Sequence, residues 1–279
     1  MINFLIVDKL IKEGLLEDCP YGDITTSAIV NKDKKGKADL ICKEDGVICG
    51  LPIFDRVFEI LGEVKFTSYI KEGDFLEKGN LIGILEGNAS NILIGERIAL
   101  NLLQRLSGIA TETKKFTDKV KDLNTRVLDT RKTTPNLRHI EKYAVSIGGG
   151  MNHRFSLSDG ILIKDNHISY AGGIKNAVKL VKENSSFVRK IEVEAENETQ
   201  VIEALEAGAD IIMLDNMSVE ETKKMVILIN NKAIIEASGN ITISNIREYA
   251  KTGVDFISTS AITNNFKSLD ISLKNLTIY

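Results

Sequence analysis

The segment from Asp129 to His167 concentrates side chains that could bind an anion. It reads DTRKTTPNLRHIEKYAVSIGGGMNHRFSLSDGILIKDNH and contains all three histidines of the chain. Between Asp129 and Lys164 there are six Lys or Arg residues against three Asp or Glu, whereas the whole chain carries a net charge of −3. A basic segment rich in Gly, Thr and Asn within a mildly acidic protein indicates a pocket for a small, highly charged anion such as a phosphate or carboxylate.

Two parts of this segment bear on carboxylate binding. His153 and Arg154 follow Gly148-Gly149-Gly150, and a strand-like run further on ends in Lys164. The triple glycine lacks the spacing of Rossmann and P-loop nucleotide sites, so it indicates a flexible loop near the ligand. A His-Arg pair is most often an ordinary surface feature, but its place between that loop and Lys164 favours carboxylate binding.

Acidic residues in the run IEVEAE offer a second kind of chemistry. Glu192, Glu194 and Glu196 are spaced by two, which puts all three on one face of a strand. On a buried strand, stacked carboxylates repel one another unless cations lie between them. Lys132, Lys164 or a divalent metal would supply those cations.

A metal is the favoured partner for two carboxylates of this region. Asp215 ends the next apolar run, ADIIMLD, and forms a candidate ligand pair with Glu194. Ligand sets made only of oxygen favour Mg²⁺ or Mn²⁺ over zinc. The histidine spacing is not that of a zinc protease helix. The alternative is that both carboxylates form structural ion pairs.

Two short loops of small and hydroxyl residues are candidates for phosphate binding. Ser238-Gly239-Asn240 and Thr259-Ser260-Ala261 each follow an apolar run near the end of the chain. Placed just before a helix, such residues expose backbone N–H groups to an anion, and α/β barrels often use their last two loops in this way. The alternative is a pair of ordinary helix caps.

The elements that must position these residues are predicted by a repeated pattern. Six short apolar runs each end in polar residues about 20–33 residues apart and precede helical stretches, which is typical of βα units with buried parallel strands. Such units close most simply into a barrel, whose functional groups lie at the carboxyl ends of the strands. The runs are TRVLDTRK, DGILIKDN, RKIEVEAEN, ADIIMLDN, AIIEASGN and VDFISTSA.

The first third of the chain is predicted to mix helices and strands. Phe4–Leu16 has helical periodicity, and Ala38–Leu85 is strand-like and interrupted by glycines. Asn91–Asp122 is helical again, either as one long helix or as two broken near Ser107-Gly108. The tail 264–279 is too short for another βα unit and is expected to pack on the first domain.

Composition excludes several classes of protein. Cys19, Cys42 and Cys49 are odd in number and lack C-x-x-C spacing, which indicates reduced thiols in a cytoplasmic protein. Charged residues interrupt any signal peptide, and no apolar run is long enough to cross a membrane. The mild negative charge gives no reason to expect nucleic acid or an anionic membrane as a partner.

Taken together, the motifs resemble the quinolinate phosphoribosyltransferase family, the decarboxylating nicotinate-nucleotide pyrophosphorylases. The matching pieces run in order over nearly the whole chain, and several are long, so the resemblance is specific. They are LLEDCPYGDITT, GERIALNLLQRLSGIAT, DTRKTTPNLR, EKYAVSIGGGMNHRFSLSDGILIKDNH, IEVEAEN, GADIIMLDNM, EASGNI and STSAIT.

The resemblance implies an α/β fold with an N-terminal α/β sandwich domain and a C-terminal incomplete α/β barrel. The expected bounds are 1–110 for the sandwich, completed by the tail 264–279, and 111–263 for the catalytic barrel. It also implies a homodimer, with a hexamer as the alternative, in which Arg97 of one subunit reaches the active site of its neighbour.

The implied reaction converts quinolinate and phosphoribosyl pyrophosphate, with Mg²⁺, to nicotinate mononucleotide, pyrophosphate and CO₂ in de novo NAD biosynthesis. Lys132, Glu194 and Asp215 are the implied catalytic residues, with Glu194 and Asp215 serving the metal and the ribose. The residues implied to hold quinolinate and pyrophosphate are Thr130, Arg131, Lys132, His153, Arg154 and Lys164, and those implied for the 5′-phosphate are Ser238, Gly239, Asn240, Thr259, Ser260 and Ala261.

One residue departs from the family pattern. Ser260 stands where the family usually has glycine, in a turn of the S-x-G-A type. If this turn requires a positive φ, serine is strained there and the affinity for phosphate falls.

Three other functions compete with this interpretation. Lys164 at a strand end could serve as the amine of a Schiff-base aldolase, although its neighbours are charged instead of apolar. A second alternative is a paralogue of the same fold that acts on another anion, such as the relatives associated with molybdenum transport. A non-enzymatic binding or scaffold protein would leave the coincidence of Arg131, His153, Arg154, Glu194 and Asp215 unexplained.

Overall fold

The computed structural model describes residues 2–31 and 33–279, which form two compact units. The first unit contains the chain up to Lys114 together with Thr134–Gly149 and Phe266–Tyr279. The second contains Lys115–Thr133 and Gly150–Asn265. Each unit has its own sheet, one antiparallel and one parallel, so the predicted α/β fold class is confirmed.

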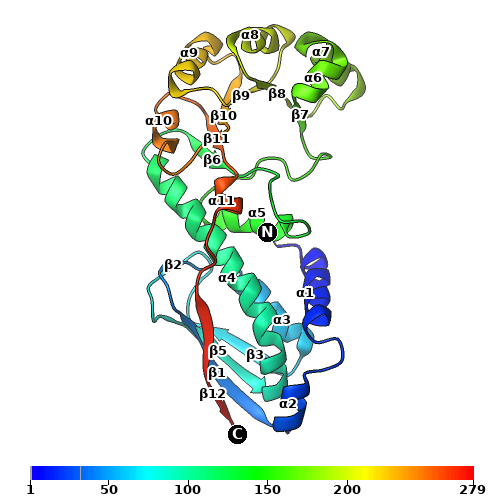
Figure 1. Ribbon diagram of the computed structural model, residues 1–279, viewed down its shortest axis with the longest axis vertical. Coiled ribbons are helices and arrows are strands. Elements are labelled where there is room, and N and C mark those ends of the chain that lie inside the picture. The colour runs from blue at the N-terminus through cyan, green and yellow to red at the C-terminus, as the bar shows by residue number, and fades with distance from the viewer. Residues whose placement is uncertain (1, 32) are drawn as a thin grey trace. The chain divides into compact units, whose positions relative to one another are not determined.

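An antiparallel sheet of order β12-β1-β5-β3 forms the centre of the first unit. Its strands are β1 (Lys35–Cys42), β3 (Val64–Ser68), β5 (Leu81–Asn88) and β12 (Ile271–Ile278). The last strand of the chain therefore pairs with the first, from Gly36 opposite Ile278 to Cys42 opposite Ile271 (Figure 1). Two short strands, β2 (Gly46–Val47) and β4 (Phe75–Leu76), form a separate pair.

Helices complete the core of the first unit. They are α1 (Phe4–Asp18), α2 (Ile24–Ile29), α3 (Leu51–Leu61), α5 (Arg138–Ile147) and most of α4 (Ala89–Val120). The ring of Phe54 on α3 lies 4.9 Å from that of Phe66 on β3. Gly95 lets α4 approach α3, because a Cβ atom there would lie 2.7 Å from the Phe58 ring. Burial of these apolar surfaces stabilises the unit.

One helix of this unit was not expected, and another decides between two alternatives that the sequence left open. The segment Ala38–Leu85 contains α3 as well as strands, since the glycine-rich pattern around it obscures its helical periodicity. The helix α4 is continuous, and Gly108 does not break it. A Cβ atom on Gly108 would lie 2.4 Å from the carbonyl oxygen of Lys267, so glycine is present there because another backbone passes close by.

Six parallel strands form the sheet of the second unit, in the order β6-β11-β10-β9-β8-β7. All six predicted runs supply a strand. The strands are β6 (Arg126–Leu128), β7 (Ile161–Ile163), β8 (Ile191–Ala195), β9 (Ile211–Asp215), β10 (Ile234–Ser238) and β11 (Phe256–Ser258). Every residue of β8 is buried, as expected for a parallel strand covered on both faces.

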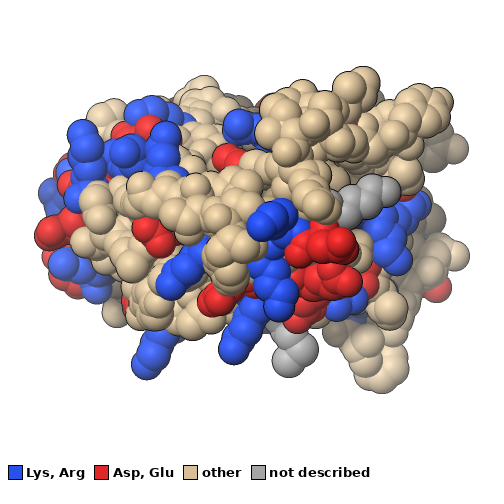
Figure 2. All heavy atoms as spheres, turned by 90° about the horizontal axis from the view of Figure 1, so that it is seen from below, with Lys and Arg blue, Asp and Glu red and all other residues tan. Residues whose placement is uncertain are grey.

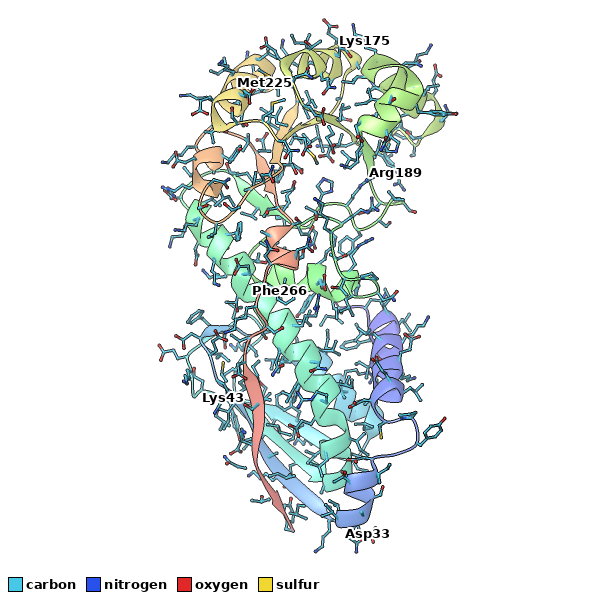
Figure 3. All side chains as sticks on the ribbon, in the orientation of Figure 1. Asp33, Lys43, Lys175, Arg189, Met225 and Phe266 are labelled. Carbon is cyan, nitrogen blue, oxygen red and sulfur yellow. The ribbon has the colours of Figure 1, made fainter. Side chains whose placement is uncertain are left out.

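The helices α6 (Asp165–Ala171), α7 (Ile174–Asn184), α8 (Glu198–Ala207) and α9 (Val219–Ile229) lie on the outer side of the strands (Figure 1). Two short helices follow, α10 (Ile246–Ala250) and α11 (Ala261–Asn264). Figure 3 marks Lys175 on α7 and Met225 on α9. Lys175 pairs with Glu206 at the surface, at 2.6 Å, whereas Met225 is buried in the core. The buried residues of α9 are Thr222, Met225 and Ile229, spaced by three and four, so this helix has one buried face.

The surface mixes charges of both signs. On the face shown in Figure 2, acidic and basic side chains of the described residues lie among uncharged ones, without a broad area of one sign. No helix in the described part of the chain is long and apolar enough to span a membrane.

Candidate functional site

A cavity of about 690 Å³ opens at the carboxyl ends of the parallel strands in the second unit. The structure brings fourteen of the fifteen predicted site residues together in its lining. They are Thr130, Arg131, Lys132, His153, Arg154, Lys164, Glu194, Asp215, Ser238, Gly239, Asn240, Thr259, Ser260 and Ala261. Side chains from strands far apart in the sequence thus converge on one space, as barrel topology requires.

The remaining predicted residue, Arg97, lies on α4 in the first unit and does not line this cavity. Conversely, the cavity contains polar residues that the sequence interpretation did not single out, namely Asn216, Thr242, Ser258 and Asn265. Asn216 directly follows Asp215 at a strand end, and this position is the signal that could have identified it.

Two guanidinium groups share the cationic side of the cavity. Burial and the positive charge of Arg131 together lower the pKa of Arg154 from its usual value. Arg154 Nη1 donates to the carbonyl oxygen of Gly160 at 2.9 Å, which fixes one edge of its fork. Two like charges held close together in a cavity lose their mutual repulsion when an anion binds between them.

The loop that carries Arg154 is braced from outside the cavity. Arg189, marked in Figure 3, donates from Nη1 to the carbonyl oxygens of Ser158 and Asp159, at 2.5 and 2.8 Å. Asp159 in turn accepts from the backbone N–H of Phe155 at 2.8 Å. These bonds limit the motion of the loop and so pre-organise the guanidinium of Arg154.

Asp129 fixes the position of His153. The Asp129 carboxylate is completely buried and accepts from the backbone N–H of His153 at 2.8 Å and from Asn152 Nδ2 at 2.6 Å. The neighbouring residue Met151 bridges to Leu128 on β6. The sequence interpretation did not assign this role to Asp129, because nothing in its local sequence indicates burial.

A buried cluster of His153, Glu192 and Glu236 lies beside the cavity. His153 Nε2 lies 3.1 Å from a Glu192 carboxylate oxygen and 3.6 Å from one of Glu236. His153 Nδ1 accepts from the backbone N–H of Arg154 at 2.7 Å, so Nε2 carries the proton and donates toward the carboxylates. One ligand atom from each residue lies within 4.8 Å of the others, close enough to share one cation or one proton.

Burial and the neighbouring charges determine the protonation of Glu236 in this cluster. Burial, followed by the neighbouring charge of Glu192, raises the pKa of Glu236 to about 8, although His153 opposes the shift. Glu236 Oε1 has no hydrogen-bond partner among the described residues. The raised pKa favours the protonated, neutral form of Glu236, which lowers the repulsion between the two carboxylates.

The pH dependence of stability is expected to report on Glu236. Because its pKa is about 8 in the folded protein and near 4.5 in an unfolded chain, only the folded protein keeps this proton between those values. The free energy of unfolding should therefore fall as the pH rises through this window. Thermal melting of Glu236→Gln across the window should show a smaller fall. Glu17→Gln, a change at an exposed glutamate, should melt like the wild type, and an unchanged slope in Glu236→Gln would contradict the assignment.

Basic side chains lie beside the two buried carboxylates of β8, as expected for glutamates stacked on one face of a buried strand. Lys164 Nζ forms an ion pair with Glu194, His153 faces Glu192, and Glu196 is exposed beyond the end of β8. Lys164 is thus engaged by a carboxylate, an arrangement that does not favour imine formation on its amine. Asp215 accepts from Asn216 Nδ2 at 2.7 Å and also lines the cavity.

The two candidate phosphate loops differ from each other. Thr259 Oγ1 accepts from the Ala261 N–H at 3.2 Å at the start of α11, as predicted for a loop preceding a helix. By contrast, α10 begins at Ile246, so no helix follows Ser238-Gly239-Asn240 directly and that expectation was wrong. Ser260 has φ −82°, within the region that any residue adopts, so its departure from glycine causes no backbone strain.

Comparisons with known proteins agree on one family. Models of the quinolinate phosphoribosyl transferase N-terminal and C-terminal domains match residues 23–107 and 109–274. A "probable nicotinate-nucleotide pyrophosphorylase (carboxylating)" of Bacillus subtilis is 43% identical over 98% of this chain and 94% of its own length. A protein of the same name from Methanocaldococcus jannaschii is 46% identical over 95% of each. The crystal structure of NadC from Streptococcus pyogenes matches with a TM-score of 0.96 at 42% identity, covering 100% of this chain and 99% of the other.

Proposed function

The chain belongs to the quinolinate phosphoribosyltransferase family, and we propose that the cavity of its second unit is the active site. The enzyme is a decarboxylating pentosyltransferase of de novo NAD biosynthesis. It converts quinolinate and phosphoribosyl pyrophosphate to nicotinate mononucleotide, pyrophosphate and CO₂. The word "carboxylating" in the names of relatives describes this equation in the opposite direction.

One observation carries the assignment of the site. A single cavity gathers five cationic or basic side chains and two acidic ones at the carboxyl ends of parallel strands. This set matches a substrate pair that brings two carboxylates and several phosphates together with a ribose. The side chains are Arg131, Lys132, His153, Arg154, Lys164, Glu194 and Asp215.

Catalysis at this site rests on charge and position. The pyridine nitrogen of quinolinate is already a nucleophile, so no side chain needs to remove a proton from it. Arg131 and Arg154 suit the planar carboxylates by bidentate pairing, with His153 beside them, and Lys132 and Lys164 suit phosphate oxygens as point charges. Holding the nitrogen against the anomeric carbon in this way converts an encounter between two molecules into a step within one complex.

Glu194 and Asp215 complete the site on the side of the ribose. Both carboxylates line the cavity, and oxygen donors of this kind fit a Mg²⁺ ion that keeps several waters and also binds substrate phosphates. The ion would neutralise charge on the departing pyrophosphate. The two carboxylates would stabilise positive charge at the anomeric carbon as the bond to pyrophosphate breaks. When CO₂ departs from the adjacent carbon, the positive charge of the alkylated ring nitrogen stabilises the electron pair left on that carbon, which then takes up a proton from water.

The two loops of small residues would hold the 5′-phosphate. Ser238, Ser260 and Asn240 line the cavity with hydroxyl and amide side chains, whereas the Thr259 hydroxyl donates to the Ile241 carbonyl oxygen at 2.8 Å. These groups are neutral. They suit the 5′-phosphate because it stays bonded to the ribose throughout the reaction and is not a leaving group. The cationic side chains remain available for the pyrophosphate that leaves.

Substrate analogues test the assignment of activity and site together. The purified protein should form nicotinate mononucleotide from quinolinate, phosphoribosyl pyrophosphate and Mg²⁺. Phthalate, which has the two carboxylates without the ring nitrogen, should inhibit competitively against quinolinate. Nicotinate, which lacks the second carboxylate, should be a poor substrate. Equal use of nicotinate and quinolinate would contradict the proposed pairing of two carboxylates with the cationic residues.

We also propose a dimer in which Arg97, on α4 of the first unit, acts in the active site of the neighbouring subunit. Arg97→Ala and Lys132→Ala should each be nearly inactive as homodimers. When the two variants are co-expressed with different tags, a heterodimer purified on both tags contains one site with Arg97 and Lys132 intact. About half the wild-type activity per dimer is therefore expected, since one site of two is complete. Inactive heterodimers of verified composition would show that Arg97 does not act across a subunit boundary.

A cytoplasmic location, which the three free thiols favour, stays a prediction.

A further inference from the structure

Asn216 occupies a junction between two strand ends. It follows Asp215 at the end of β9, and its backbone N–H donates to the carbonyl oxygen of Ser238 at 2.9 Å. Its side chain makes two further bonds, because Nδ2 donates to Asp215 Oδ2 at 2.7 Å and Oδ1 accepts from Asn240 Nδ2 at 3.0 Å. One residue therefore connects a carboxylate on one strand end with an amide on the next.

The backbone at this junction has little freedom. Asn216 has φ 56° and Asn240 has φ 53°, both in the left-handed region that asparagine tolerates better than most residues. Gly239, between the strand β10 and Asn240, has φ 89°, and a Cβ atom there would lie 2.2 Å from Asn216 Oδ1. The glycine is therefore required by the close approach of the Asn216 side chain as well as by its own conformation.

We propose that Asn216 is a positioning residue that sets the distance between the carboxylate of Asp215 and the loop Gly239-Asn240. This inference rests on the proposed function, in which Asp215 serves the ribose and the loop holds the 5′-phosphate. A ribose 5-phosphate unit is short and has few rotatable bonds, so its two ends bind together only when these two protein groups are correctly spaced. Pyrophosphate makes no such demand, because in the proposed arrangement it does not reach the loop Gly239-Asn240.

The substitution Asn216→Gly isolates the side chain from the backbone. Glycine adopts φ 56° without strain, so both side-chain bonds are lost while the local conformation remains accessible. Asn230→Gly is a matched control, because Asn230 is also left-handed, with φ 46°, but caps the exposed end of α9 outside the cavity lining. The two variants should melt at similar temperatures.

The test compares two inhibitors of the complete enzyme. In Asn216→Gly, the inhibition constant of ribose 5-phosphate should weaken about tenfold, as expected for the loss of two modest hydrogen bonds. The inhibition constant of pyrophosphate and the KM for quinolinate should stay within about twofold of the wild type, and Asn230→Gly should change none of the three. A general structural disturbance would weaken both inhibitors.

Each result decides between specific claims. Equal inhibition of wild type and Asn216→Gly by ribose 5-phosphate would overturn the positioning role, and so would parallel weakening of both inhibitors. The failure of the proposed function has a different signature, since the wild-type enzyme would then form no nicotinate mononucleotide at all. Asn216→Asp offers a second check, because it keeps the acceptor for Asn240 but loses the donor to Asp215. It should weaken ribose 5-phosphate at least as much as Asn216→Gly, and wild-type affinity in this variant would also contradict the proposal.

Discussion

Arg131→Ala and Arg154→Ala are each expected to reduce kcat/KM for quinolinate by tenfold to a hundredfold or more. Both guanidinium groups line the cavity, and their charges are close enough that Arg131 lowers the pKa of Arg154. A hydrogen bond to a charged group contributes on the order of 1.5–3 kcal/mol, and each factor of ten in rate corresponds to about 1.4 kcal/mol. Loss of a bidentate contact therefore accounts for an effect of this size.

The arginine prediction can be separated from simple disruption of the loop. Arg154 also bonds the carbonyl of Gly160, so its truncation removes a loop contact as well as a charge. Arg154→Lys keeps the charge without the planar fork and should give an intermediate loss. Arg126→Ala, at the exposed start of β6, should retain wild-type kinetics. Steady-state rates at varied quinolinate measure these effects, and wild-type kinetics in either alanine variant would rule out the carboxylate assignment.

Glu194→Gln and Asp215→Asn are expected to slow the release of CO₂ and pyrophosphate by the same factor, about a hundredfold. Removal of one preorganised electrostatic contact to a charge that develops in the transition state typically costs this much. Quinolinate binding should persist, because the contacts proposed for its carboxylates are with Arg131 and Arg154. Glu196→Gln is a matched control, since Glu196 has the same spacing but is exposed.

Removal of Mg²⁺ by chelation should stop both products together. The ring nitrogen becomes an electron sink only after it has bonded to the ribose, so a step that cannot transfer the ribosyl group cannot release CO₂. Calorimetry with quinolinate alone, alongside parallel assays of the two products, distinguishes binding from chemistry. If the carboxylate variants slowed the release of CO₂ and of pyrophosphate by different factors, ribosyl transfer and decarboxylation would not be coupled.

The second unit was largely predictable from sequence. Strands such as β8 and β9 are buried on both faces, so each gives a continuous apolar run that ends where the chain reaches solvent. The polar residue at that end, such as Glu194 or Asp215, is therefore both a boundary marker and a site candidate. Barrel topology then brings these ends together without further information about distant contacts.

Other features depend on contacts between distant segments. Glu236 lies on β10 and Glu192 on β8. Only one strand, β9, lies between these two in the sheet, and this arrangement brings both carboxylates close to His153. Gly108 resembles a helix break until the backbone of Lys267 is placed beside it. Asn216 is conspicuous only through its bonds to Asp215 and Asn240. Each of these residues has an ordinary local sequence, so periodicity and spacing could not identify its role.

The most direct test of the proposed mechanism follows the fate of the carboxylate at ring position 2. Quinolinate labelled with ¹³C in that group is incubated with the enzyme and Mg²⁺, with and without phosphoribosyl pyrophosphate. With it, labelled CO₂, pyrophosphate and nicotinate mononucleotide should appear in equal amounts, because decarboxylation requires the alkylated ring nitrogen. Without it, no labelled CO₂ should form. Labelled CO₂ released in the absence of phosphoribosyl pyrophosphate would contradict the coupling of ribosyl transfer to decarboxylation.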